Sequence, residues 1–230
     1  MNPEQEQLVV AIELSQQEGS VAAKNGESAI VEKSVAQRVR EKDTFLPAIQ
    51  DVVSDVGGDP KEITAVIVSS GPGSFTGLRV SIAAAKMIAI STGATVVSIP
   101  SSINVVASDE NHGTQSLVVS AHKNDTSWVS VVNHSDRWSC DGTVISNKEL
   151  ARMVDTHTVL YGDEFLSDAL KQCCVNNAIE IRPHHASATT LLTVGLQWLR
   201  LGITTDPAQL LPIYPREPEA VRLWKERKHR

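Results

Sequence analysis

A glycine-rich turn is the part of this sequence whose residue types come nearest to doing chemistry. It runs from Ser69 to Arg79, reads SSGPGSFTGLR, and lies between a short β-branched run and a helical pattern. At a strand-to-helix junction, free backbone N–H groups and the positive end of the helix dipole can hold an anion. The residues that we single out as candidate contacts to an anion or a nucleotide are Gly71, Gly73, Thr76 and Arg79.

The turn does not fit the two common phosphate-binding motifs. A Walker A loop ends in Gly-Lys-Ser/Thr, whereas Gly77 is followed here by Leu-Arg. A dinucleotide-binding turn needs a third glycine, where Thr76 stands, and an acidic residue about 20 positions later. No Asp or Glu occurs between residues 63 and 108.

The turn is also a poor nucleophile elbow. That motif needs glycines two positions before and after its serine, but Pro72 and Thr76 flank Ser74. Three interpretations therefore stay open from the motifs alone: a packing turn that aims the helix, a phosphate or nucleotide contact, and a catalytic site.

The histidines and cysteines do not form a metal-binding pattern. An HxxxH pair would place two imidazoles on one face of a helix, and none of the 7 histidines has that spacing. His184 and His185 are adjacent, so their side chains point apart on a helix or a strand. Cys140, Cys173 and Cys174 include no CxxC motif, which indicates reduced thiols and not a disulfide framework.

Composition is that of an ordinary globular protein. Of 230 residues, 41% are hydrophobic and 21% are charged, and 21 basic against 27 acidic residues give a net charge of −6. This balance argues against a protein that coats nucleic acid through its overall field. The only strongly basic run, Arg222–Arg230, is interpreted as a solvated tail or as a segment that touches RNA or a partner. No signal peptide or membrane span is predicted, so we expect a cytoplasmic protein with no membrane partner.

The elements that position the turn follow from apolar periodicity. Strands are predicted over Leu8–Leu14, Ser20–Lys24 and Glu27–Lys33, with Asn25-Gly26 as a type I′ hairpin signal. There follow a helix over Thr44–Val56, a strand over Ile63–Val68, the turn, a helix over Leu78–Ile90, a strand over Ala94–Ile99 and a helix over Pro100–Ala107. This order predicts a mixed sheet and suggests the ribonuclease-H-like half of an actin-type fold.

A second half is predicted beyond a polar linker at Ser108–Gly113. Its strands are expected over Leu117–Ala121, Ser127–Asn133 and Thr158–Tyr161, and its helices over Lys148–Val154, Phe165–Cys174 and Ala188–Leu201. We therefore expect an α/β protein of two halves, each a mixed sheet with helices. Residues 1–108 would form the ribonuclease-H-like half, and residues 109–230 a smaller half with a Pro-rich, basic tail.

The stretch Val68–Ala89, VSSGPGSFTGLRVSIAAAKMIA, resembles the signature of the bacterial TsaB (YeaZ) family of tRNA threonylcarbamoyladenosine biosynthesis proteins, in the glycoprotease-like ASKHA superfamily. Leu46-Pro47, Ile99–Ala107 and Pro212–Arg216 (PIYPR) are similar to further family segments. The resemblance implies an actin-like (ASKHA) fold. It also implies a non-catalytic subunit that supports TsaD, the transferase that converts adenosine 37 of tRNA to N6-threonylcarbamoyladenosine (t6A).

From this resemblance we expect a TsaD-type subunit as the main partner, a TsaE-type ATPase as a further candidate, a homodimer when the chain is alone, and only indirect contact with tRNA. We expect no catalytic residue, no metal and no cofactor of the chain's own, with ATP or ADP bound only at a junction of the complex. The helix after the turn is the expected partner surface, through Ser74, Phe75, Gly77, Leu78, Val80, Ser81 and Ala84.

Three departures from the family pattern weaken the small-molecule sites. The first strand ends in Ile12–Ser15 (IELS) where the family has Ile-Asp-Thr, whose carboxylate faces the nucleotide's magnesium in active relatives. Glu41 stands where a histidine is common, and Ala121–Lys123 replaces an Asp-Ala-Arg run. Two alternatives stay open: a small ASKHA-type phosphotransferase or hydrolase that uses Glu13, and a diverged paralogue that only homodimerises.

Overall fold

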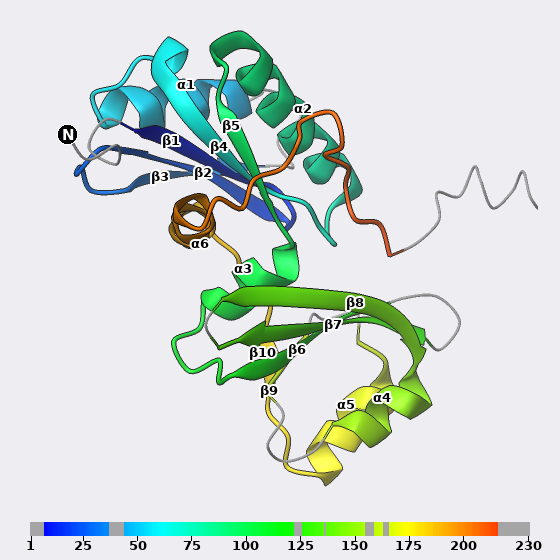
Figure 1. Ribbon diagram of the computed structural model, residues 1–230. Coiled ribbons are helices and arrows are strands. Elements are labelled where there is room, and N and C mark those ends of the chain that lie inside the picture. Colours follow the sequence, from blue (N-terminus) through cyan, green and yellow to red (C-terminus); the bar gives the residue numbers. More distant parts are fainter. Residues whose placement is uncertain are drawn as a thin grey trace, which may run out of the picture. The chain divides into compact units, whose positions relative to one another are not determined.

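The computed structural model describes residues 7–36, 44–121, 126–135, 137–154, 159–162 and 166–215, and the chain forms two compact units (Figure 1). Unit 1 comprises Met1–His112 and His184–Ile213, and unit 2 comprises Gly113–Pro183 and Tyr214–Arg230. This corrects the expected boundaries of 1–108 and 109–230, because the last helix packs on the first sheet. The basic run 222–230, Glu41 and the His122-Lys123 pair lie outside the described residues.

Unit 1 is built on a five-stranded mixed sheet in the order β3-β2-β1-β4-β5. Strands β1 (Leu8–Glu13), β2 (Glu18–Asn25) and β3 (Val31–Ala36) pair antiparallel, and β4 (Ile63–Ser69) and β5 (Thr95–Ile99) continue the sheet parallel to β1. Both faces of β1 and β4 are covered, which explains their nearly continuous apolar sequences, LVVAIE and ITAVIVS. The predicted order of strands and helices is confirmed for this sheet.

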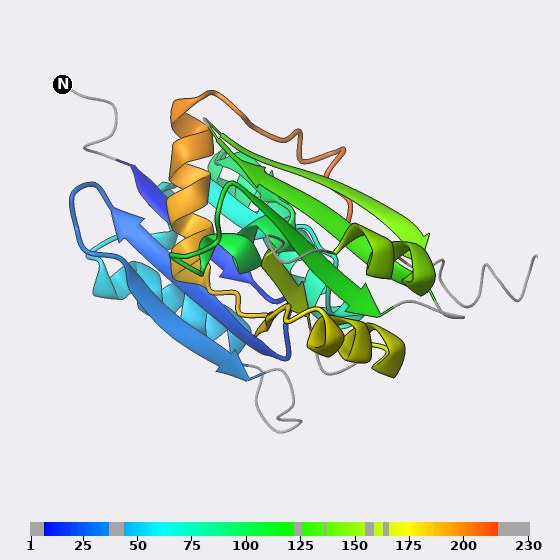
Figure 2. The same cartoon turned by 90° about the horizontal axis from the view of Figure 1, so that it is seen from below.

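Helices cover both faces of this sheet (Figure 2). On one face, α1 (Phe45–Asp55) packs against β2 and β3, and α2 (Phe75–Thr92) packs against β4 and β5; a short 3-10 turn, η2 (Pro60–Glu62), leads into β4. On the other face, α6 (Ala188–Arg200) lies across β1 and β2, next to α3 (Ser101–Ala107). Gly195 lets α6 approach closely, because a Cβ there would lie 2.3 Å from Ile67 Cδ1 of β4.

The connection between β2 and β3 corrects the predicted type I′ turn. Ser28 N donates to Asn25 O at 2.9 Å, so Gly26 and Glu27 are the central residues. Only Gly26 has a positive φ, of 50°, whereas a type I′ turn needs two. Asn25 stays extended because it is paired with Leu8 of β1.

Unit 2 is a second five-stranded mixed sheet, in the order β10-β9-β6-β7-β8. Strands β6 (Gln115–Ala121), β7 (Thr126–His134) and β8 (Trp138–Ser146) form an antiparallel meander, and β9 (Val159–Gly162) and β10 (Ile181–Pro183) run parallel to β6. Helices α4 (Asn147–Met153) and α5 (Asp168–Asn176) bury a core that includes Leu117, Val119, Leu150, Leu160 and Leu170. The expected α/β class, with a mixed sheet in each half, is confirmed.

Two strands of unit 2 were not predicted. The side chains of β8 are mostly exposed because it is the edge strand, so its sequence lacks an alternating apolar pattern. Strand β10 has only 3 residues, which is too short for periodicity to register.

Within the described part of the chain, α2 alone is long and apolar enough to cross a membrane by length and composition. Its buried residues Ile82, Ala85 and Ala89 belong to the core cluster beneath the sheet's covering helices. The helix is therefore a structural layer of unit 1.

Candidate functional site

The glycine turn joins β4 to α2 at the carboxyl ends of β1 and β4. Ser74 caps the helix, since its hydroxyl accepts a hydrogen bond from Gly77 N at 3.2 Å. Ser74 N donates to Ser15 O at 2.7 Å, and a Cβ on Gly73 would lie 2.3 Å from the same oxygen. Because of this cap, α2 begins at Phe75, before the predicted start at Leu78.

The first half of the turn is bonded to α3 and to the segment after α6. Gly71 N donates to Ser101 Oγ at 3.0 Å, and Gly71 O accepts from Ser101 N at 2.9 Å. Ile213 N donates to Ser70 O at 2.7 Å. Gly71 has a φ of 104°, and a Cβ there would lie 2.7 Å from Ile213 O, so only glycine fits. The peptide bond from Gly71 to Pro72 is cis.

These bonds limit what the turn can do as an anion cradle. The backbone N–H groups of Gly71, Ser74 and Gly77 all have acceptors within the protein. Of the four candidate anion contacts, Gly71 is buried, whereas Gly73, Thr76 and Arg79 are exposed. The turn therefore fits the interpretation of a packing turn that aims the helix. Its exposed polar groups lie only at Gly73 and near the start of α2.

The Arg79 guanidinium lies against an aromatic ring. Its central carbon is 3.7 Å from the centroid of the Phe75 ring, a cation–π contact one helical turn apart. This contact holds a positive charge at the outer surface near the start of α2.

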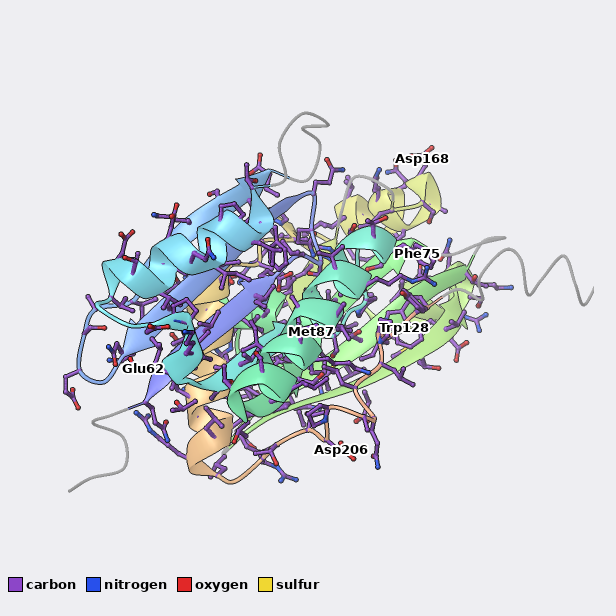
Figure 3. The ribbon with its side chains drawn as sticks, turned by 90° about the horizontal axis from the view of Figure 1, so that it is seen from above. Glu62, Phe75, Met87, Trp128, Asp168 and Asp206 are labelled. Atoms are coloured by element: carbon purple, nitrogen blue, oxygen red, sulfur yellow. The ribbon has the colours of Figure 1, made fainter. Side chains whose placement is uncertain are left out.

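The outer side of α2 carries an apolar stripe made of Val80, Ala83, Met87 and Ile90, which we call the α2 stripe. Spacings of three, four and three residues place all four on one face of the helix. The exposed fractions are 41% for Val80, 63% for Met87 and 75% for Ile90. Figure 3 views unit 1 from the side on which α2 is outermost and labels Phe75 and Met87.

The inner side of α2 corrects part of the predicted partner surface. Gly77, Leu78 and Ser81 are buried, because their side of the helix faces β4 and the sheet. Ser81 Oγ donates to Leu78 O at 3.1 Å, so this hydroxyl is satisfied inside the helix. These three residues are core residues of unit 1 and do not line an exposed surface.

The remaining predicted partner residues are at least partly exposed, namely Ser74, Phe75, Val80 and Ala84. Met87 and Ile90, the two most exposed members of the stripe, were not among the predicted partner residues. The spacing from Val80 could have found them.

Glu13, the carboxylate that replaces the family's aspartate, is fully buried at the end of β1. Its Oε1 accepts from Ser15 N at 2.6 Å, and its Oε2 accepts from Asn104 Nδ2 at 2.7 Å. Burial raises the pKa of the Glu13 carboxyl above its ordinary value, and the polar groups of Ser15, Asn104 and Ser69 oppose this rise. The carboxylate is therefore bonded to internal donors and is not presented at a surface.

Small polar residues surround this carboxyl group. Ser69 Oγ and Ser101 Oγ form a buried hydroxyl pair at 2.6 Å. Asn104 Nδ2 also donates to Ser187 O, at the residue that caps α6, at 3.1 Å. Across the ranges that the structure describes, no three His, Cys, Asp or Glu residues come together as they would to hold a metal ion.

Comparison with known proteins adds a family likeness that covers the turn and α2. Residues 34–139 match the family model described as TsaD, tRNA N6-adenosine threonylcarbamoyltransferase. The tRNA threonylcarbamoyladenosine biosynthesis protein TsaB of Bacillus subtilis (strain 168) is 25% identical over 104 residues, which are 45% of this chain and 45% of that protein. The chain thus aligns with less than half the length of this curated relative.

Two solved structures share the fold across almost the whole chain. YeaZ from Pseudomonas aeruginosa superposes with a TM-score of 0.72 at 16% identity, covering 90% of this chain and 100% of that chain. A protein described as similar to peptidase YEAZ from Pseudomonas aeruginosa gives 0.70 at 20% identity, covering 91% and 100%. At these identities the likeness concerns the fold. The chain is therefore similar to TsaB in sequence over part of its length and to YeaZ in fold over most of it, and the segment that matches the TsaD family model contains the glycine turn.

Proposed function

We propose that the chain is a non-catalytic subunit of the machinery that makes t6A at position 37 of tRNA, where it binds and supports a TsaD-type transferase. The likeness to TsaB and to the TsaD family model supports this pathway. The observation that carries the subunit role is the α2 stripe, an exposed apolar face on an otherwise well-packed helix.

The chemistry of the stripe indicates the kind of partner. Apolar residues that alternate by three and four positions fit the groove of a second helix. Arg79 and Lys86 are the only charged residues of α2, so a matching partner helix would place acidic side chains around its own apolar face. Burial of Met87 and Ile90 would each contribute about 1.5–3 kcal/mol before the cost of association.

Two features support the non-catalytic part of the proposal. Glu13 is turned inward onto Ser15 N and Asn104 Nδ2, so it would have to break both hydrogen bonds to reach a bound metal or phosphate. The backbone donors at the start of the turn are likewise occupied. Both features count against the alternative of a small phosphotransferase or hydrolase that uses Glu13.

The proposed setting follows from the same role. We infer a cytoplasmic protein with no cofactor of its own, with ATP or ADP bound only where it meets other subunits. A TsaE-type ATPase would be a further partner, tRNA would be contacted through the complex, and two copies would pair through the α2 stripe when the chain is alone.

Size-exclusion chromatography with light scattering tests the proposal on this chain, alone and mixed with the TsaD-type subunit of the same organism. The wild-type chain should co-elute with that subunit as a defined complex. Met87→Asp and Ile90→Asp should each lower the affinity at least tenfold, because an ionised group would be buried in the contact. Circular dichroism of each variant should match the wild type, since both side chains are exposed.

Val175→Asp is the matched control, because Val175 is 73% exposed on α5 of unit 2. It should co-elute as the wild type does. A homodimer that ignores the TsaD-type subunit would favour the diverged paralogue, and unchanged complexes of Met87→Asp and Ile90→Asp would remove α2 from the contact.

A further inference from the structure

The Glu13 carboxyl group has no ionic partner in its surroundings. β4 and α3 contain no charged residue, and the only charged residue of the glycine turn is Arg79, which is exposed and lies against the Phe75 ring. Arg200, at the far end of α6, is the only charged residue of that helix. On β2 the residue paired with Glu13 is Ser20, with Glu18 and Lys24 further along the strand.

The start of α6 brings three more titratable groups into this part of unit 1. Glu32 of β3 accepts from Ala188 N at 2.9 Å and from Thr189 Oγ1 at 2.5 Å, and His184 and His185 precede the helix cap. None of these contributes to the raised pKa of Glu13, which arises from burial. The buried carboxyl is thus a site whose charge is balanced only by neutral hydrogen-bond donors.

The two oxygens of Glu13 are not equivalent toward a proton. Oε1 accepts from the backbone N–H of Ser15, a donor that cannot reverse. In the protonated state the proton would sit on Oε2, which Asn104 Nδ2 faces at 2.7 Å. In that state two donors would point at each other.

A buried acceptor is already present to resolve this conflict. Asn104 Oδ1 is buried and has no hydrogen-bond partner. Rotation of the Asn104 amide by half a turn would bring Oδ1 to face Oε2 and let the carboxylic acid donate to it. Asn104 itself is fully buried, so the rotated amide would stay in the same pocket of side chains.

The same rotation changes the start of α6. Asn104 Nδ2 also donates to Ser187 O at 3.1 Å, and this oxygen accepts from Leu191 N at 3.0 Å as the first bond of the helix. After rotation, Oδ1 would face Ser187 O, so two acceptors would oppose each other. The carbonyl of Ser187 would lose one donor and shift away.

We propose that Glu13 is a proton-binding site that switches the Asn104 side chain between two hydrogen-bonded states and so tightens or releases the first turn of α6. The proton comes from water and converts the carboxylate to the carboxylic acid, with no other bond made or broken. This switch belongs to unit 1 and does not depend on the proposed function.

Side-chain amide resonances of the 15N-labelled full chain, followed from about pH 5 to about pH 9, test the switch directly. The Asn104 Nδ2 resonance should show one transition, because Nδ2 donates to Glu13 Oε2 and Ser187 O only in the high-pH state. Exchange of the Leu191 amide, corrected for its intrinsic pH dependence, should be roughly fivefold faster in the low-pH state, the effect of weakening one hydrogen bond. Glu13→Gln, which carries no titrating proton, should abolish both changes.

Glu32→Gln is the matched control, since it alters an acid at the same helix start and leaves Glu13 in place. It should retain the Asn104 transition. An Asn104 resonance that does not respond to pH, a transition that persists in Glu13→Gln, or a Leu191 amide that ignores the transition would each overturn the proposal.

Infrared spectroscopy of the wild-type chain keeps the test valid if Glu13→Gln fails to fold. A protonated carboxyl band should appear with the same midpoint as the Asn104 transition. A different midpoint would also overturn the proposal.

Discussion

Ile213 donates its backbone N–H to the carbonyl oxygen of Ser70 at 2.7 Å, which ties the segment that follows α6 to the start of the glycine turn. Earlier in this segment Thr205 N donates to Val96 O at 2.8 Å, and Thr205 Oγ1 accepts from Ser98 N at 3.1 Å. Residues 203–213 therefore run along the outer edge of β5 and use backbone groups that an edge strand would otherwise leave unpaired.

Leu210 is predicted to anchor this segment. Its side chain is 2% exposed and belongs to the main core cluster of unit 1, so Leu210→Ala should lower the free energy of unfolding by about 2–5 kcal/mol. The neighbouring Leu211 is 71% exposed, and Leu211→Ala should change the free energy of unfolding by less than about 0.5 kcal/mol. Hydrogen exchange of the β5 amides in urea measures both, and equal costs would contradict the anchoring role.

The elements around the glycine turn could be predicted because local signals agree there. The run ITAVIVS indicates a strand buried on both faces, and Gly93, with a φ of 75°, ends α2 as predicted. The segment after α6 has no such signal, because its contacts to β5 and Ser70 are made by backbone groups far apart in sequence. The packing of α6 on the sheet of unit 1 could not be predicted either, because it depends on contacts with strands that are far away in the sequence.

Which residues of the candidate partner surface are exposed could be predicted only in part, for a specific physical reason. Helix α2 is apolar on both sides, so residue type alone does not say whether Leu78 or Val80 faces the sheet. The packing on β4 decides it and leaves Val80 and Met87 outside. The buried hydrogen bond from Asn104 to Glu13 could not be predicted either, since the two residues lie 91 positions apart along the chain.

Gly195 is predicted to set the distance between α6 and β4. Gly195→Ala would place a Cβ 2.3 Å from Ile67 Cδ1, so the helix must shift, at a cost of about 1–3 kcal/mol in the free energy of unfolding. Thr193→Ala, at an exposed position of the same helix, should cost less than about 0.5 kcal/mol. Denaturant unfolding provides the comparison.

A double-mutant cycle with Ile67→Ala identifies the cause of that cost. In the Ile67→Ala background, which lacks the side chain that the new Cβ meets, Gly195→Ala should lower the free energy of unfolding markedly less than in the wild type. Costs that simply add would show that another contact is responsible.

The adjacent thiols of α5 are predicted to react at different rates. Cys174 is fully buried in the unit 2 core, whereas Cys173 is partly exposed, with its Sγ 3.7 Å from Ala151 O. Burial raises the pKa of the Cys174 thiol, which lowers its thiolate fraction at neutral pH. In the native chain a maleimide should therefore label the Cys174→Ser variant faster than the Cys173→Ser variant, as followed by mass spectrometry. Equal rates before urea is added would contradict this reading of α5.

Glu13→Gln is predicted to change how stability depends on pH. The pKa of Glu13 is raised above its ordinary value of 4.5 in the folded chain, so the folded state binds the proton more readily than the unfolded state does. The stability linked to this group is complete below 4.5 and is lost as pH rises through the folded pKa.

The variant has no titrating group at this position. Its free energy of unfolding should therefore rise relative to that of the wild type as pH rises, by about 1.4 kcal/mol per pH unit between the unfolded-state and folded-state pKa values of Glu13. Urea unfolding of both chains at a series of pH values gives this difference directly, because all other titrating groups cancel. The difference should then level off above the folded pKa, where the wild-type carboxylate is fully ionised. A difference that stays constant, or that shrinks as pH rises, would mean that burial does not raise the proton affinity of this carboxyl group.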